Sequence, residues 1–252
     1  MKAHWPSKVK EEWQVKMGEY PKILTQVLFD FTKGKTKTHQ FIRIAGLSGS
    51  GKTTQILPAV EAYSKKRELN PVLVAARLFV KYHPHYQEII DYYGEKELRK
   101  MTDEFSTIMM FLTLSALTDA GFDIVLDVTL LDPEIEQILL SLLVKNHYDK
   151  LLLMIATSPT VTEHFLLGRA WRHSAETEHE FIRATEHALH FYAKSSPEMR
   201  IILWSVYDLK PIYDGPVSDS LSIFTDYSSR TELPKSDDDA RRAAKIEYLL
   251  NL

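Results

Sequence analysis

The sequence predicts an α/β fold with three layers, in which helices cover both faces of a five-stranded, mainly parallel sheet. Two observations lead to this prediction. A glycine-rich loop pattern, G-x-x-x-x-G-K-[ST], occupies Gly46–Thr53 and lies between a buried apolar stretch and a helical one. Short apolar stretches then alternate with helical periodicity as far as residue 206, as in sheets whose parallel strands are joined by helices.

Composition excludes several classes of protein. Of the 252 residues, 44% are hydrophobic and 26% are charged, which is typical of a soluble globular chain. The net charge of −3 argues against a general nucleic-acid binder. The chain has no cysteine, which excludes disulfides, thiolate metal sites and a cysteine nucleophile. No apolar signal segment or membrane-spanning run is present, so we expect a cytoplasmic protein without membrane contact.

Residues 1–40 form a basic, helical leader. Eight lysines against four acidic residues give this leader a charge of +4, which leaves −7 for the rest of the chain. Pro21 suits the first turn of a helix and Gly34 its end. The helix carries one apolar stripe, so it either packs against the sheet or binds a partner or the protein's own site. The stripe consists of Ile23, Leu24, Val27, Leu28 and Phe31.

The core is expected over residues 41–216, followed by an extension over 217–252 that ends in a helix. After the loop, one helix should run from Lys52 to about Lys66, with a local kink at Pro58. A lid is expected around residues 160–195, after the fourth strand. The five predicted strands cover residues 41–45, 71–76, 122–128, 151–156 and 201–206.

The loop pattern indicates a P-loop kinase-like fold that binds ATP with Mg²⁺. Glycines allow successive backbone N–H groups to face one phosphate, and the following helix N-terminus adds partial positive charge. Lys52 would reach the β- and γ-phosphates, and the Thr53 hydroxyl would ligate Mg²⁺. The candidate nucleotide-binding residues are Gly46, Leu47, Ser48, Gly49, Ser50, Gly51, Lys52, Thr53 and Thr54.

Further polar residues follow the third and fourth strands. Asp127 ends the third strand, where it either holds Mg²⁺ or caps the next turn. Thr129 lies on the same strand face as Asp127. Arg169 and Arg183 follow the fourth strand, where small-molecule kinases place a lid, so they are candidate cations for the γ-phosphate or else ordinary surface arginines.

From about Ile23 to Gly215 the sequence resembles the zeta toxins, P-loop kinases that phosphorylate UDP-N-acetylglucosamine. The resemblance rests on the loop, on Phe79-x-x-x-His83-Pro84, on Asp127-Val128-Thr129, and on Ile155–Pro159 with Arg169 ten residues beyond. It implies that Arg169 and Arg183 contact the γ-phosphate and that His83 lies near the acceptor sugar. It also implies that Asp127, where the family usually has Glu, and Thr129 line the acceptor pocket.

One position departs from the family pattern. The family's second strand normally ends in D-x-F-[RK]-x-x-H-P, whose Asp takes the proton of the acceptor hydroxyl, but here Arg77 stands in its place. Two hypotheses follow. The protein is either a zeta-toxin-like kinase for a nucleotide sugar or similar small molecule, with Arg77 binding an anionic acceptor, or an ATP-binding pseudokinase or regulator. In either case a separate antitoxin protein or the N-terminal helix could restrain the site.

Overall fold

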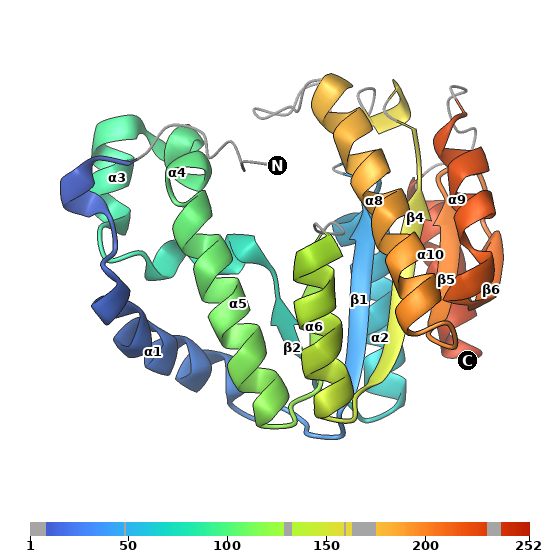
Figure 1. Ribbon diagram of the computed structural model, residues 1–252, viewed down its shortest axis with the longest axis horizontal. Coiled ribbons are helices and arrows are strands. Elements are labelled where there is room, and N and C mark those ends of the chain that lie inside the picture. Colours follow the sequence, from blue (N-terminus) through green and yellow to red (C-terminus); the bar gives the residue numbers. More distant parts are fainter. Residues whose placement is uncertain (1–8, 48, 129–132, 159, 163–174, 231–237) are drawn as a thin grey trace.

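The computed structural model of the protein describes residues 9–47, 49–128, 133–158, 160–162, 175–230 and 238–252. Its centre is a six-stranded sheet with the strand order β2-β3-β1-β4-β5-β6 (Figure 1). β6 pairs antiparallel with β5, and all other pairs are parallel. β1 therefore lies inside the sheet between β3 and β4, and the carboxyl ends of these three strands share one edge.

The parallel strands are rich in apolar residues, because both of their faces are covered. In β1 all residues after the first are buried, and in β4 the last five are buried. The strands are β1 (Gln40–Gly46), β2 (Val72–Val74), β3 (Ile124–Asp127), β4 (Asp149–Ala156), β5 (Arg200–Ser205) and β6 (Tyr213–Pro216).

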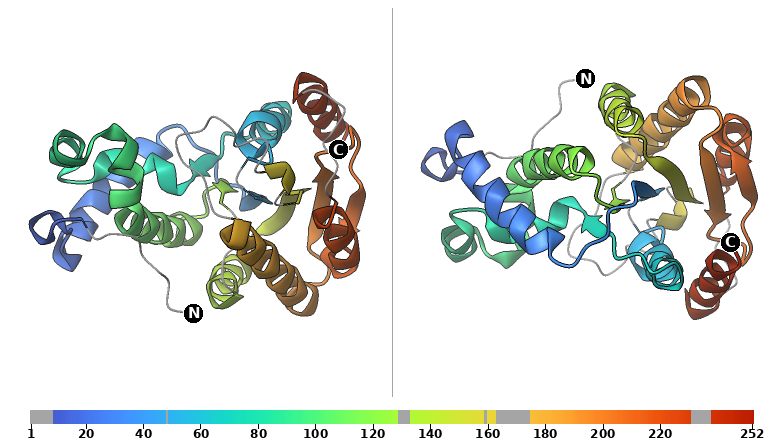
Figure 2. Two further views of the ribbon diagram at one scale, coloured as in Figure 1. Left: turned by 90° about the horizontal axis from the view of Figure 1, so that it is seen from above. Right: turned by 90° about the horizontal axis from the view of Figure 1, so that it is seen from below.

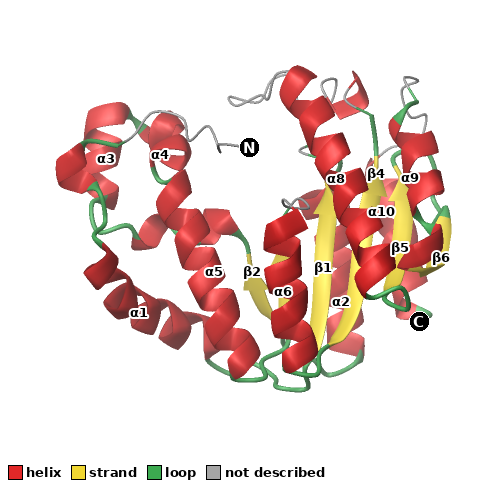
Figure 3. Ribbon diagram, in the orientation of Figure 1, coloured by secondary structure: helices red, strands yellow, loops and turns green. Residues whose placement is uncertain are grey.

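Helices form a layer on each face of the sheet (Figures 2 and 3). Phe41 and Ala45 of β1 face the layer that contains α5, α6, α8 and α9, whereas Ile42 and Ile44 face α2 and α10. The helices are α1 (Tyr20–Thr32), α2 (Leu57–Lys66), α3 (Tyr86–Tyr93), α4 (Glu95–Met101), α5 (Asp103–Asp119), α6 (Pro133–Lys145), α8 (Ala175–Ser195), α9 (Leu221–Ser228) and α10 (Asp238–Leu250). No helix of the described segments is long and apolar enough to cross a membrane.

Helices α1, α3 and α4 extend beyond the β2 edge of the sheet, beside α5 (Figure 1). The apolar stripe of α1 packs into the core cluster around α5 and β2, with Val27 fully buried. This confirms that the stripe is a packing surface. The Tyr82 hydroxyl donates a hydrogen bond of 2.8 Å to Asp30 of α1, and Lys10 lies 3.5 Å from the ring centre of Tyr92. The leader is therefore held on the helices that follow β2.

The predicted fold class is confirmed, but two of its details are wrong. The sheet has a sixth strand, β6, whose Tyr-Asp-Gly-Pro sequence lacks a buried apolar pattern because it lies half-exposed at an edge. The helix after the loop begins with a π-helical turn, Lys52–Ile56, and α2 starts only at Leu57. The helical segment is thus continuous from Lys52 to Lys66, and its irregular turn lies directly before Pro58, as expected of a residue that removes one backbone donor. β2 is shorter than predicted, because the chain turns into a 3-10 helix at Ala76–Leu78.

A buried ionic cluster joins the sheet to its α6 and α8 layer. Arg43 of β1 is 2% exposed and donates to Glu136 of α6 and, at 3.2 Å, to the Tyr192 hydroxyl of α8. Tyr192 donates in turn to Glu136, which is fully buried. Burial raises the pKa of Tyr192 strongly, so its hydroxyl stays protonated and the charges of Arg43 and Glu136 balance each other. The cluster fixes α6 and α8 over β1, the strand that leads into the loop.

Candidate nucleotide and acceptor site

The phosphate-binding loop follows β1 directly and depends on glycine at both ends. Gly46 has a φ of +139°, and a Cβ there would lie 2.9 Å from the Ser50 hydroxyl and 3.0 Å from the Ile155 carbonyl. Gly51 has a φ of +96°, and a Cβ there would lie 2.7 Å from the Gln55 side chain. Both positions combine a left-handed backbone with close neighbours, so only glycine fits without strain.

Lys52 and Ser50 turn their polar atoms into this loop. The Lys52 ammonium donates hydrogen bonds of 2.7 Å to the Gly46 carbonyl and 2.8 Å to the Leu47 carbonyl. The Ser50 hydroxyl is buried, and it has no hydrogen-bond partner among the described residues. Thr53 and Thr54 follow and are exposed. A lysine, a hydroxyl without a partner and positive-φ glycines in one turn fit a phosphate group.

Asp127 and Arg77 meet at the carboxyl end of the neighbouring strand. Asp127 ends β3 and stands in register opposite Ile44, two residues before Gly46. Arg77, from the 3-10 helix after β2, places Nη2 2.7 Å from Oδ2 of Asp127. The Asp127 side chain is 2% exposed and that of Arg77 is 36% exposed. The cation that replaces the family's usual Asp therefore covers a buried carboxylate beside the loop.

His83 lies in the same segment after β2 and is buried, with its ring 4.8 Å from that of Phe105 at an angle of 73°. Its Nδ1 accepts a hydrogen bond of 3.1 Å from the backbone N–H of His85. Burial, and then the nearby His85, lower the pKa of His83 to about 4. His83 is therefore neutral at pH 7 and carries its proton on Nε2. It can donate a hydrogen bond to a neutral group, but it supplies no positive charge.

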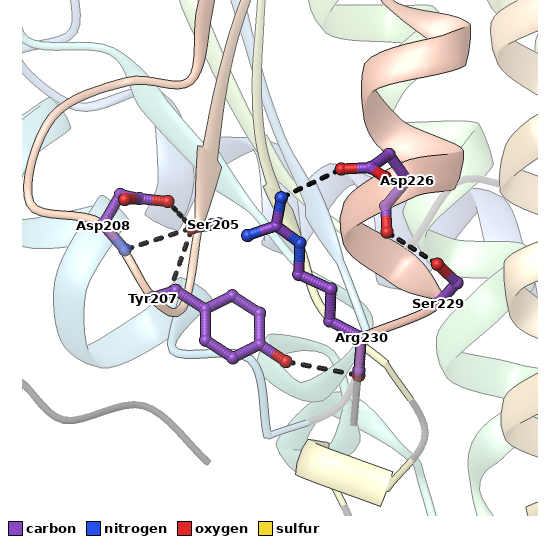
Figure 4. Close-up of polar contacts among 6 residues, drawn as sticks. All are labelled: Ser205, Tyr207, Asp208, Asp226, Ser229 and Arg230. Carbon is purple, nitrogen blue, oxygen red and sulfur yellow. Dashed lines mark hydrogen bonds and ion pairs between the residues drawn. The ribbon is translucent and has the colours of Figure 1, made fainter. Parts of the chain in front are cut away.

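The turn after β5 is fixed by a polar network at the same edge of the sheet (Figure 4). The Ser205 hydroxyl donates to Asp208 at 2.7 Å and accepts from the backbone N–H groups of Tyr207 and Asp208, each at 3.1 Å. The Tyr207 hydroxyl donates to the Arg230 carbonyl at 3.2 Å, and Arg230 pairs with Asp226 at 2.9 Å. These contacts tie the β5 turn to the end of α9.

Several predicted positions lie outside the described residues, namely Ser48, Thr129 and Arg169. Arg183 is described, and it lies exposed on α8 with no ion pair to any described residue. The structure thus brings together the loop, Asp127 and Arg77. It shows no contact between Arg183 and the described loop residues, and the proposed roles of both arginines stay predictions.

Sequence reasoning missed a connection between the loop and the C-terminal extension. Gln55, in the π-helical turn, donates a hydrogen bond of 2.9 Å to Asp238 at the start of α10. Arg241 is 2% exposed and pairs with the same carboxylate at 2.5 Å. Gln55 lies 183 positions before Asp238, so no local sequence pattern predicts their contact. Arg241 lies three positions after Asp238 on the same helix, so this pair can be predicted from the local sequence. The local signal is the acidic first turn of the last helix.

The residues fit ATP better than they fit a protein-held metal. No group of three or more metal-ligating side chains occurs in the described segments. Mg²⁺ commonly binds through one or two protein groups together with nucleotide phosphates, so the exposed Thr53 hydroxyl suits that use. Asp127 was predicted as a second ligand, but its carboxylate is held by the Arg77 cation. This ion pair favours a role toward the acceptor over a role as metal ligand.

Comparisons with known proteins identify the family and the fold. A sequence profile of the zeta toxin family matches residues 26–197. Toxin PezT of Streptococcus pneumoniae (serotype 4, strain ATCC BAA-334 / TIGR4) is 29% identical over 146 residues, which covers 57% of this chain and 56% of PezT. The match thus spans only about half the length of this relative.

Two solved structures are similar in fold. A structure from the PezAT chromosomal toxin–antitoxin system of S. pneumoniae has a TM-score of 0.70 at 22% identity, and covers 96% of this chain and 100% of that one. A structure of AvrRxo1-ORF1:-ORF2 with ATP has a TM-score of 0.55 at 14% identity, and covers 92% and 84% of the two chains.

A phosphate-binding loop at the carboxyl end of a central parallel strand, with helices on both faces of the sheet, defines a P-loop α/β protein with a kinase-like fold. The family profile covers more than half of the sequence, from the middle of α1 to the end of α8. The chain belongs to the zeta toxin family.

Proposed function

We propose that the protein is an ATP-dependent kinase that transfers the γ-phosphate to a hydroxyl of UDP-N-acetylglucosamine or a related nucleotide sugar. The observation that carries the proposal is the loop itself. Its Lys52 ammonium and its partnerless Ser50 hydroxyl are held in a turn that only glycine can make at Gly46 and Gly51. Membership of the zeta toxin family supports the proposal, and one fold neighbour was solved with ATP.

Catalysis in this proposal depends on positioning and charge. Loop N–H groups and Lys52 hold the β- and γ-phosphates, and Thr53 would hold the Mg²⁺ that neutralises phosphate charge. Arg169 and Arg183 approach the transferring group from the segment after β4. His83 donates from Nε2 to a neutral group of the sugar, and Asp127 and Thr129 line the acceptor pocket.

A second candidate is an ATP-binding pseudokinase or regulatory protein. The Arg77–Asp127 ion pair favours this second candidate. Arg77 replaces the usual catalytic carboxylate, and its guanidinium is also paired with Asp127, the nearest remaining carboxylate. A positioned general base contributes roughly two to four powers of ten in rate, so its loss would leave ATP binding with little turnover. The intact loop and Lys52 favour the kinase.

We also propose that the protein acts in the cytoplasm under the control of another protein. The PezAT neighbour is described as a toxin–antitoxin system, so an antitoxin that covers the loop and Arg77 is the corresponding partner here. The N-terminal helix is the alternative restraint, since α1 and the preceding residues are held on the helices that follow β2.

The first test is ATP binding by thermal unfolding. At about one hundred times its dissociation constant, ATP with Mg²⁺ should stabilise the fold by about 2.7 kcal/mol and raise Tm by roughly 5–10 °C. Lys52→Ala should reduce the shift, whereas Lys65→Ala, a change of an exposed lysine on α2, should keep it. An unmoved Tm for the parent protein at millimolar ATP would refute the assignment of the loop.

The second test is transfer, followed by mass spectrometry of UDP-N-acetylglucosamine incubated with the protein, ATP and Mg²⁺. The sugar nucleotide should gain one phosphate with the parent protein and none with Lys52→Ala. Arg169→Ala and Arg183→Ala should keep the ATP-dependent rise in Tm but lower the transfer rate by roughly three powers of ten. A protein that binds ATP yet phosphorylates no small molecule would favour the regulatory candidate.

A further inference from the structure

The Arg77–Asp127 pair differs from the Arg43–Glu136 pair in the exposure of its cation. In the Arg43–Glu136 pair the two side chains are 3% and 0% exposed, and the Tyr192 hydroxyl completes the contacts. In the Arg77–Asp127 pair the carboxylate is 2% exposed but the guanidinium is 36% exposed. Both side chains of the first pair are buried, whereas the second pair leaves its cation partly exposed near the carboxyl ends of β2 and β3.

Both members of the Arg77–Asp127 pair keep unused hydrogen-bonding capacity. Oδ2 of Asp127 lies 2.7 Å from Arg77, yet it accepts no well-aligned hydrogen bond from any described group. A guanidinium carries five N–H donors in a planar fork. Asp127 is the one ion-pair partner of Arg77 within the described segments. Arg77, which is 36% exposed, can therefore bind a second anion. A hydroxyl reaches the buried Asp127 carboxylate when the Arg77 side chain shifts toward that anion.

The Arg77–Asp127 pair lies beside the phosphate-binding loop. Asp127 stands opposite Ile44 on β1, the strand that ends in Gly46, so the carboxylate borders the phosphate-binding turn. Neutral His83 belongs to the same segment after β2 as Arg77. Arg77 and Asp127 therefore offer an acceptor one cation and one carboxylate beside the loop.

Resting on the proposed kinase activity, we propose that the acceptor carries a carboxylate or phosphate group on its sugar, close to the hydroxyl that is phosphorylated. Arg77 binds this anion with its bidentate fork, and Asp127 receives the hydroxyl proton. The acceptor oxygen forms a bond to the γ-phosphorus, the bond from that phosphorus to the β,γ-bridging oxygen breaks, and ADP leaves. Arg77 and Asp127 together replace the single Asp that the family places after its second strand.

Two matched pairs of acceptors test the preference. UDP-glucose and UDP-glucuronate share the diphosphate and differ by a carboxylate on the sugar, and glucose and glucose 6-phosphate differ by a phosphate. Initial rates with ATP and Mg²⁺ should give a kcat/KM that is roughly 10- to 100-fold higher for the anionic member of at least one pair, as expected for a charge-assisted hydrogen bond. The pair that shows the preference identifies the anion.

Variants assign this preference to Arg77. Arg77→Gln should bring the ratio of kcat/KM values close to one, and Arg77→Lys should keep part of it because the charge remains. Arg67→Gln, a change of an exposed arginine beyond α2, should leave the ratio unchanged. If Arg77→Gln fails to fold because Asp127 is left unpaired, the double variant Arg77→Gln/Asp127→Asn removes both charges. That variant should bind ATP but transfer no phosphate.

The outcomes separate this inference from the proposed function. Phosphorylation of UDP-N-acetylglucosamine, UDP-glucose and glucose without preference for either anionic probe would overturn the role of Arg77 but keep the kinase. An unchanged preference in Arg77→Gln would also overturn it. A parent protein whose Tm does not respond to ATP would instead overturn the proposed function. ATP binding without transfer to any of these probes would overturn the inference and favour the pseudokinase.

Discussion

Replacing Lys245 by Met should stabilise the protein at neutral pH. Lys245 lies on α10 and is fully buried, and its ammonium donates a 3.5 Å contact to the Arg241 carbonyl. It also lies 5.8 Å from the ring centre of Trp204. Burial, and then the adjacent Arg241, lower the pKa of Lys245 to about 8, while Asp238 opposes the shift weakly. Folding therefore disfavours the charged form of this side chain.

The size and sign of the effect follow from that pKa. An unperturbed lysine has a pKa near 10.5, so a shift to about 8 corresponds to a cost of about 3 kcal/mol when the side chain is protonated in both states. The folded pKa lies below the unfolded one, so the free energy of unfolding rises as pH increases from about 8 toward 10.5. At pH 10 the remaining cost is about 1 kcal/mol.

Urea unfolding of the parent and of Lys245→Met at pH 7 and pH 10 measures this cost directly. The variant should be more stable by about 1–3 kcal/mol at pH 7, since Met fills a similar volume without a charge, and the gap should shrink at pH 10. Lys65→Met, at an exposed position on α2, should change stability by less than about 0.5 kcal/mol at either pH. A destabilised Lys245→Met, or a gap that does not depend on pH, would refute the account of Lys245 as a destabilising buried cation.

Three further changes test other parts of the structure. Glu136→Gln should lower the free energy of unfolding in urea by about 3–5 kcal/mol, because it leaves the buried Arg43 guanidinium without its carboxylate. Gly51→Ala should lower Tm and weaken the ATP-dependent rise in Tm, because a Cβ there would meet Gln55 at 2.7 Å; an unchanged ATP response would contradict the described loop. Asp123 accepts backbone N–H bonds of 2.8 Å from Thr38 and 2.9 Å from Gln40. Burial alone would raise the pKa of Asp123, but hydrogen bonds from the Thr36 side chain, from these two N–H groups and from the Thr38 hydroxyl lower it. Asp123→Asn should cost about 1–3 kcal/mol in urea at pH 7, and the gap to the parent should narrow as pH falls below about 4.

The sequence predicts the parts of the site that depend on local patterns. The loop needs positive-φ glycines at fixed spacing and a lysine directly after the last one, so Gly46–Thr53 can be recognised without tertiary structure. Asp127 can be placed for a similar reason, because the end of a buried apolar strand fixes which edge of the sheet it reaches. The short edge strand β6 cannot be predicted in this way, because its residues are half-exposed and show no apolar pattern.

Contacts between distant parts of the chain are not predictable in this way. The sequence indicates that Arg77 replaces a catalytic Asp, but nothing in the local pattern shows that its guanidinium lies 2.7 Å from Asp127, 50 positions later. Whether an arginine faces solvent, substrate or a carboxylate is decided by the packing of the 3-10 helix after β2, which lies against α5. The same sequence change is therefore compatible with a lost catalytic base and with a new anion site, and the comparison of neutral and anionic acceptors distinguishes the two.

The C-terminal extension is best understood as part of the nucleotide-binding half of the protein. α10 lies beside α2 on one face of the sheet, and its Leu249 packs in the same core cluster as Ile56 and Val60 (Figure 2). The first residue of α10, Asp238, accepts a hydrogen bond from the side chain of Gln55, which lies two positions after Thr53. A helix that fixes the turn on which Lys52 and Thr53 are carried contributes to the geometry of the phosphate site.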